Sequence, residues 1–137
     1  MAVTHDHSGK TSARPWALAH LPEAAGEART IAQELLSGWG VVGDVADSVL
    51  LTVSELVANA VQHAQPPLCM GLGCNHDTGR VHVEVSDGGP ACDDWAANLA
   101  DDEHGRGLLI IDQLAAAHGD RREAGRAVHW ADIAYAW

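Results

Sequence analysis

The amino-acid sequence predicts a two-layer α/β sandwich of the α+β type, with helices on one face of a mixed, mainly antiparallel sheet. Two amphipathic helical patterns fill the first half of the chain. Residues 81–86 alternate strictly between apolar and polar side chains, as a half-buried strand does. Turn residues join the strand-like segments of the second half into hairpins. Helices followed by hairpin-joined strands favour this fold class.

Two helices are predicted before residue 65. The first opens at Pro22 and ends by Gly40, because proline suits a first helical turn and glycine suits a C-terminal cap. The second begins near Asp44 and runs to about Ala64, where the Pro66-Pro67 pair prevents its continuation. The apolar residues of the first helix recur at helical spacing: Ala24, Ala28, Ile31, Leu35 and Leu36.

Five strands are predicted around these helices. Asn75–Gly79 and Gly125 are turn-like and connect neighbouring strands. A further apolar helix is expected over 108–117, before the last hairpin. The predicted strands, in chain order, are 16–20, 68–74, 81–86, 118–123 and 128–135.

Charge and hydrophobicity argue against several kinds of partner. The chain carries 8 basic and 19 acidic residues, a formal charge of −11, which repels nucleic-acid backbones and anionic membranes. No run approaches the roughly 20 apolar residues of a membrane helix. Residues 1–13 lack an apolar stretch and are predicted to be a disordered arm, which leaves 14–137 as one domain. A cytoplasmic location is expected.

The three cysteines, Cys69, Cys74 and Cys92, form no disulfide pattern. They are interpreted as reduced thiols, in agreement with a cytoplasmic protein. A metal site made by Cys69, Cys74 and His76 is an alternative, although its spacing fits no common zinc pattern.

A polar stripe runs along the second helix. At ~100° per residue, it comprises Ser48, Thr52, Glu55, Asn59 and Gln62. A solvated helix face is the simplest interpretation. However, the middle of the stripe holds one charged residue, and the spacing of Glu55 and Asn59 lets a carboxylate and an amide oxygen reach one cation. Mg²⁺ takes such ligands and completes its shell with water and phosphate.

Two glycine motifs follow the helices. Asp87-Gly88-Gly89 leaves a strand, where a carboxylate can accept a hydrogen bond from an exocyclic amine and Gly89 admits a flat ring. An ordinary Asp-Gly turn is the alternative. Gly105-Arg106-Gly107 opens a helix, and its backbone N–H groups suit a phosphate. Neither a P-loop lysine nor a Rossmann glycine pattern is present.

Taken in order, these motifs resemble the histidine-kinase-like ATPase superfamily, which has the Bergerat fold. Residues 54–64 resemble its asparagine box, and residues 85–90 and 105–111 resemble its two glycine boxes. Within the superfamily, the short chain is similar to the anti-sigma regulatory factors, which are serine/threonine protein kinases. Three short features share this similarity: Trp39-Gly40-Val41, Gly105-Arg106-Gly107-Leu108 and Val128-His129-Trp130. The resemblance covers about residues 21–134 and implies ATP and Mg²⁺ as cofactors.

The resemblance also implies residue roles at the nucleotide. Asn59 would ligate Mg²⁺, and Glu55 would act as general base on a serine hydroxyl of a protein substrate. Asp87 would bind the adenine amino group, with Gly89 beneath the ring. Many relatives have a threonine where this chain has Ala127, so a hydroxyl contact that supports the adenine site is missing and weaker nucleotide binding is expected.

For the phosphates, the resemblance implies contacts from Gly105 and Gly107, with Arg106 neutralising charge on the transferred phosphoryl group. His63 would lie near the phosphates or cap its helix. Residues 91–104 would form a lid over the nucleotide.

The implied function is an anti-sigma factor that sequesters a sigma factor and phosphorylates an anti-anti-sigma protein. A binding module of the same fold, without phosphoryl transfer, is the alternative, although the retained Glu55 favours the kinase. The catalytic domain of a sensor histidine kinase fits less well, because no helix pair with a phosphoacceptor histidine is present. By resemblance, a homodimer is expected, formed through the first helix and the strand that precedes it.

Overall fold

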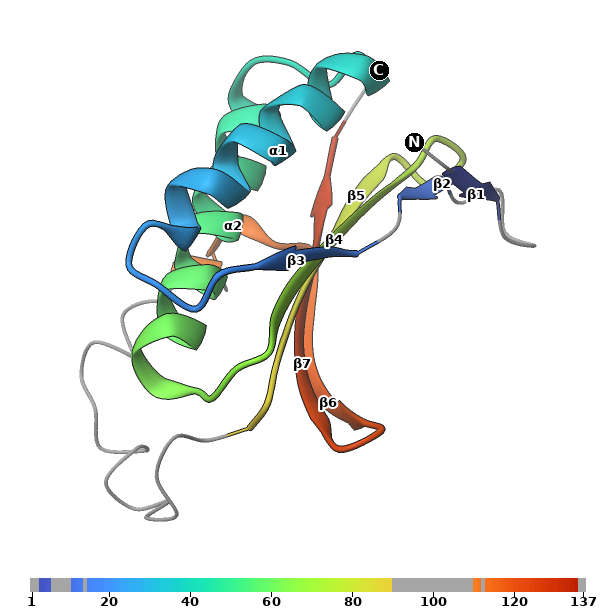
Figure 1. Cartoon of the computed structure of the whole chain (residues 1–137). Coiled ribbons are helices and arrows are strands. Elements are labelled where there is room, and N and C mark those ends of the chain that lie inside the picture. Colours follow the sequence, from blue (N-terminus) through green and yellow to red (C-terminus); the bar gives the residue numbers. More distant parts are fainter. Residues whose placement is uncertain (1–2, 6–10, 14, 90–109, 112, 136–137) are drawn as a thin grey trace.

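The computed structural model describes residues 3–5, 11–13, 15–89, 110–111 and 113–135. Two helices pack on one face of a single sheet, as Figure 1 shows. This is the predicted α+β sandwich. The elements are β1 (Val3–His5), β2 (Thr11–Ala13), β3 (Trp16–Leu18), α1 (Ala24–Trp39), α2 (Asp44–His63), β4 (Leu68–Asn75), β5 (Arg80–Asp87), β6 (Ala117–Glu123) and β7 (Arg126–Ala134).

The sheet has the strand order β1-β2-β4-β5-β7-β6, and β3 also pairs with β4. Every pairing recorded among the described residues is antiparallel, so the sheet is more uniform than the mixed one predicted. Strands β1 and β2 lie in the segment predicted as a disordered arm. The division into an arm, 1–13, and one domain, 14–137, stays a prediction.

The alternation predicted for β5 is observed. Val81, Val83, Val85 and Asp87 are buried on the face that the helices cover, while the residues between them are half-buried. Across the strand pair, Val85 lies opposite His129 of β7. Paired residues of neighbouring strands share a face, so this register decides which side chains of β7 lie under the helices.

Helix α1 uses small residues for its closest packing. Ala24, Ala28 and Ala32 are at most 1% exposed, whereas Ile31, which the sequence pattern placed in the core, is half-buried. Gly40 ends the helix in a left-handed conformation, and its N–H donates to carbonyls of the last turn. Helix α1 contacts α2, β3 and β4.

Helix α2 lies over β5 and β7. Thr52, predicted to lie in the polar stripe, is fully buried, and its hydroxyl donates to the carbonyl oxygen of Ser48 over 2.8 Å. This local bond satisfies the hydroxyl and allows its burial at the border of the apolar side. Among the described residues, no helix is long and apolar enough to cross a membrane.

The apolar helix predicted over 108–117 lies partly outside the described residues. Residues 110, 111, 113 and 114 are helical, and Ile111 is 1% exposed. The helix ends earlier than predicted, because residue 117 already belongs to β6.

Candidate functional site

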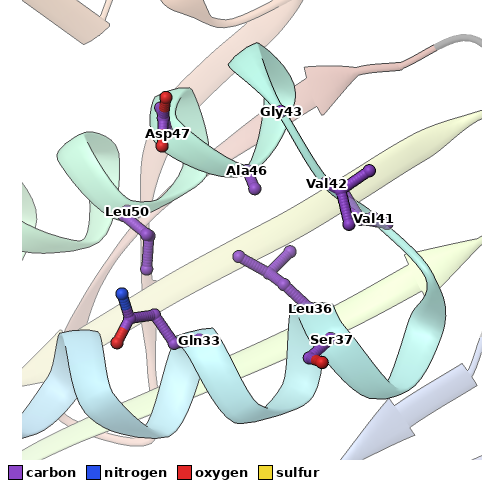
Figure 2. A pocket seen from close by; sticks show the side chains of 9 residues that line it. All are labelled: Gln33, Leu36, Ser37, Val41, Val42, Gly43, Ala46, Asp47 and Leu50. Atoms are coloured by element: carbon purple, nitrogen blue, oxygen red, sulfur yellow. The ribbon is translucent and has the colours of Figure 1, made fainter.

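Glu55 and Asn59 lie on the side of α2 that faces away from α1. The side of α2 that faces α1 borders a shallow pocket of about 250 Å³ between the two helices. Ala46 and Leu50 of α2 project into this pocket (Figure 2). At ~100° per residue, Glu55 lies opposite Ala46 and Asn59 lies opposite Leu50. Both polar side chains are half-buried. They therefore point away from α1, on the flank of α2 nearer to β7.

That pocket holds none of the candidate site residues. Its lining is mainly apolar and comes from the end of α1, the connecting loop and the start of α2: Gln33, Leu36, Ser37, Val41, Val42, Gly43, Ala46, Asp47 and Leu50.

Asp87 is the last residue of β5, and its side chain is 2% exposed. Its Oδ1 accepts a hydrogen bond from the N–H of Gly89 over 2.8 Å. Its Oδ2 lies 3.1 Å from Nε2 of His129 on β7. A buried carboxylate needs such donors, because burial without them is costly. Each oxygen keeps a further lone pair that can accept a hydrogen bond from a ligand.

Backbone hydrogen bonds join the Asp87 loop to the end of α2. The N–H of Gly88 donates to the carbonyl oxygen of Gln65 over 2.7 Å, and the N–H of Gln65 donates to the carbonyl oxygen of Gly89 over 2.8 Å. The ring of His20 contacts the carbonyl oxygens of Ala60 and Ala64 over 3.2 and 2.8 Å. The carboxyl-terminal half of α2 and the Asp87 loop are thus held side by side.

Gly88 cannot be replaced without disturbing this junction. A Cβ at Gly88 would lie 2.2 Å from the carbonyl oxygen of Pro66. We expect Gly88→Ala to destabilise the fold by about 1–3 kcal/mol, the usual cost of overpacking, measured by urea unfolding. Gly71→Ala in β4 is the control, since a Cβ there meets no atom within 4 Å. Equal stability of the two variants would contradict this role.

His129 is a site residue that the sequence motifs did not reveal. Its Nδ1 lies 2.6 Å from Oδ1 of Asp120 on β6, and its Nε2 contacts Asp87. The two carboxylates, Asp120 first and then Asp87, raise the pKa of His129 from 6.5 to about 9. The imidazole is therefore protonated at neutral pH and donates to both. The register of three strands brings these residues together, and only a correct strand alignment would have revealed the contact.

Ala127 lies directly opposite Asp87 in the β5–β7 pair. Ala127, where the resemblance implies a threonine in many relatives, therefore lies beside the carboxylate to which the resemblance assigns adenine. His129, two residues further along β7, supplies the polar contact to Asp87 instead.

The donors present suit Mg²⁺ better than a transition metal. Glu55 and Asn59 offer hard oxygen ligands from adjacent turns of α2. Within the described part of the chain, no three His, Cys, Asp or Glu side chains are grouped to hold a metal ion. Cys69 and Cys74 alternate onto opposite faces of β4, since Cys69 pairs with Ser86 and Cys74 with Val81. The alternative cluster with His76 is thus not formed.

Cys74 instead lies in a small polar cluster, with its Sγ 3.0 Å from the hydroxyl of Tyr135. Burial raises the pKa of the Cys74 thiol, so the thiol is a poor nucleophile.

Of the predicted site residues, the structure brings Asp87 and Gly89 to the end of α2 that carries Asn59 and His63. His63 is the last residue of α2 and is half-buried. The predicted phosphate motif, Gly105, Arg106 and Gly107, and the predicted lid, 91–104, lie outside the described residues.

The comparisons with known proteins agree with this architecture. The chain superposes on the structure of the RsbU and RsbW domains of Rv1364c from Mycobacterium tuberculosis with a TM-score of 0.67 and 20% identity, over 89% of this chain and 32% of that one. It superposes on the SiaB–SiaC complex from Pseudomonas aeruginosa with a TM-score of 0.59 and 15% identity, over 90% and 91% of the two chains.

This chain spans about a third of the length of the Rv1364c chain, and identities this low establish the fold alone. No curated protein sequence matches it. The family model described as "Histidine kinase-like ATPase domain" matches residues 18–130, most of the sequence. The chain therefore belongs to the histidine kinase-like ATPase domain family.

Proposed function

We propose that the protein binds ATP and Mg²⁺ beside the carboxyl-terminal half of α2 and transfers the terminal phosphoryl group to a serine or threonine of a protein partner. The observation that carries this proposal is the joining of two elements: the α2 flank with Glu55 and Asn59, and the buried Asp87 at the end of β5. Both are held together by the hydrogen bonds of Gln65. They supply a base, a cation ligand and an acceptor for an exocyclic amine.

In this proposal, Asp87 accepts a hydrogen bond from the adenine amino group, and Gly89, with φ of 99°, leaves room for the ring. Asn59 ligates Mg²⁺, which neutralises phosphate charge when bound. Glu55 accepts the proton of the attacking hydroxyl. Gly105, Gly107, Arg106 and His63 are proposed to contact the phosphates.

We further propose a regulatory role as an anti-sigma factor that binds a sigma factor and phosphorylates an anti-anti-sigma protein, in the cytoplasm and as a homodimer. The likeness to a structure that contains an RsbW domain supports this assignment. Incubation with γ-labelled ATP, Mg²⁺ and a candidate anti-anti-sigma protein tests it. Label on a serine or threonine of that protein is the expected result, and its absence with ATP bound would favour the alternative below.

A module that binds ATP or a partner without phosphoryl transfer is the second candidate. Ala127 favours it, because this residue places no hydroxyl beside Asp87. Binding of ATP without label transfer to any partner would distinguish this function from the kinase.

Asn59→Ala tests the cation ligand. We expect the variant to lose the dependence of ATP affinity on Mg²⁺, so that affinity in Mg²⁺ falls about tenfold or more toward the value measured in EDTA. Gln62→Ala, which removes an exposed amide from the same helix, is the control and should keep the dependence. Calorimetric titrations with and without Mg²⁺ measure both. A Mg²⁺ dependence that survives in Asn59→Ala would exclude Asn59 as the ligand.

A further inference from the structure

Three side chains from neighbouring strands form a connected group beside the proposed adenine site. Asp87 ends β5, His129 lies on β7 and Asp120 lies on β6. The cross-strand pairs Val85–His129 and His129–Asp120 place all three on the helix-covered face of the sheet. His129 bridges the carboxylates over 3.1 and 2.6 Å.

Exposure rises along this group from one carboxylate to the other. The side chain of Asp87 is 2% exposed, that of His129 is 33% exposed and that of Asp120 is 69% exposed. Asp87 is therefore the member that depends on its partners, because water cannot replace them. Asp120 is largely hydrated and holds the outer nitrogen of the ring.

The two donors to Asp87 fix the plane of its carboxylate. Gly89 holds Oδ1 and His129 holds Oδ2. Ala127, which lies opposite Asp87, has no polar side-chain atom that could take over from His129. Without His129, the Oδ2 atom would lose its side-chain donor and the carboxylate could rotate toward other partners.

We propose that His129, anchored by Asp120, is a positioning residue that orients the Asp87 carboxylate toward the amino group of the nucleobase and so sets the preference for adenine. The inference rests on the proposed ATP site and adds to it a residue that determines base specificity. His129 acts through Asp87 and needs no contact with the nucleotide.

Protonation controls the bridge. An imidazolium donates from both nitrogens, whereas neutral imidazole has one N–H and cannot donate to both carboxylates. Because the pKa of His129 is raised to about 9, the bridge is complete at neutral pH and is lost as the pH rises through that value. Among the described residues, the charged groups that the ring contacts are Asp87 and Asp120. Helix α2, which packs over this face, carries Glu55 and His63 on its polar flank.

The test compares ATP with ITP, whose base has a carbonyl oxygen in place of the adenine amino group. Calorimetric affinities at pH 7.5 in Mg²⁺ give the ratio of ITP to ATP dissociation constants. For His129→Ala we expect this ratio to fall about tenfold, the usual effect of one charge-assisted hydrogen bond. A general loss of structure would weaken both nucleotides equally and leave the ratio unchanged.

His82→Ala is the matched control. His82 lies on the opposite face of β5 and also bridges two carboxylates, with its Nδ1 2.5 Å from Asp132 and its Nε2 2.8 Å from Glu84. Its replacement removes an equivalent bridge away from the proposed site. The ITP-to-ATP ratio of this variant should equal that of the wild type.

The pH profile of ATP affinity provides a second readout. Wild-type affinity should decrease as the pH passes about 9. His129→Gln retains an N–H donor toward Asp87 and cannot titrate. Its ITP-to-ATP ratio of dissociation constants should therefore stay close to that of the wild type, and its ATP affinity should not decrease as the pH passes about 9. An unchanged ratio in His129→Ala, or an unchanged decrease in His129→Gln, would overturn the proposal while the ATP site stands. A wild-type protein that binds neither nucleotide would overturn both the proposal and the ATP site.

Discussion

Replacement of Glu55 by Gln should reduce phosphoryl transfer by about 10²–10⁴-fold, the usual contribution of a general base. The amide matches the carboxylate in size but cannot accept the proton of the attacking hydroxyl. Because Glu55 is half-buried on α2 and its replacement leaves the helix intact, ATP affinity should change by less than about threefold.

Single-turnover transfer to the proposed anti-anti-sigma partner and calorimetric ATP binding, measured on the same preparation, separate these two effects. Glu34→Gln removes an exposed carboxylate from α1 and should retain full transfer. If Glu55→Gln transfers phosphate at the wild-type rate, another group accepts the proton and the role assigned to Glu55 is wrong.

The second large effect is expected at Asp87. In Asp87→Asn, the amide offers a single acceptor oxygen, while Gly89 and His129 both donate to this side chain. Either one of these donors faces the NH₂ group, or His129 becomes neutral and accepts from it. In both cases the negative charge that an exocyclic amine would meet is lost. ATP affinity should fall about 10- to 100-fold, in line with about 1.5–3 kcal/mol for a hydrogen bond to a charged group.

The loss should be specific to the base. ITP affinity should change much less than ATP affinity in Asp87→Asn, because ITP has no amino group to lose. Asp132→Asn is the control, since Asp132 also contacts a histidine but lies on the other face of the sheet. Equal losses for ATP and ITP in Asp87→Asn would show that Asp87 supports the fold rather than the base.

The sequence was sufficient to predict helices α1 and α2 and strand β5. Prolines and glycines marked the helix ends, and the alternation of Val81, Val83 and Val85 identified β5 and its buried face. The segments that resemble the asparagine box, 54–64, and the first glycine box, 85–90, are each recognisable from a few consecutive residues. For that reason Glu55, Asn59 and Asp87 could be named as candidate site residues before any strand was aligned.

Contacts between distant strands could not be predicted in the same way. His129 lies 42 residues from Asp87 and nine from Asp120, and their contact depends on the register of β5, β7 and β6. Thr52 was wrongly placed in the polar stripe, because polarity alone does not show that its hydroxyl bonds to Ser48 and allows burial. Burial of this kind depends on what packs against α2.

Calorimetric titration of ATP into the full chain, with Mg²⁺ present, tests the ATP site most directly. Saturable binding of one ATP per chain is expected, weakened at least about tenfold by Asp87→Asn and made independent of Mg²⁺ by Asn59→Ala. No binding at millimolar ATP, or binding that neither substitution alters, would contradict an ATP site between α2 and the end of β5.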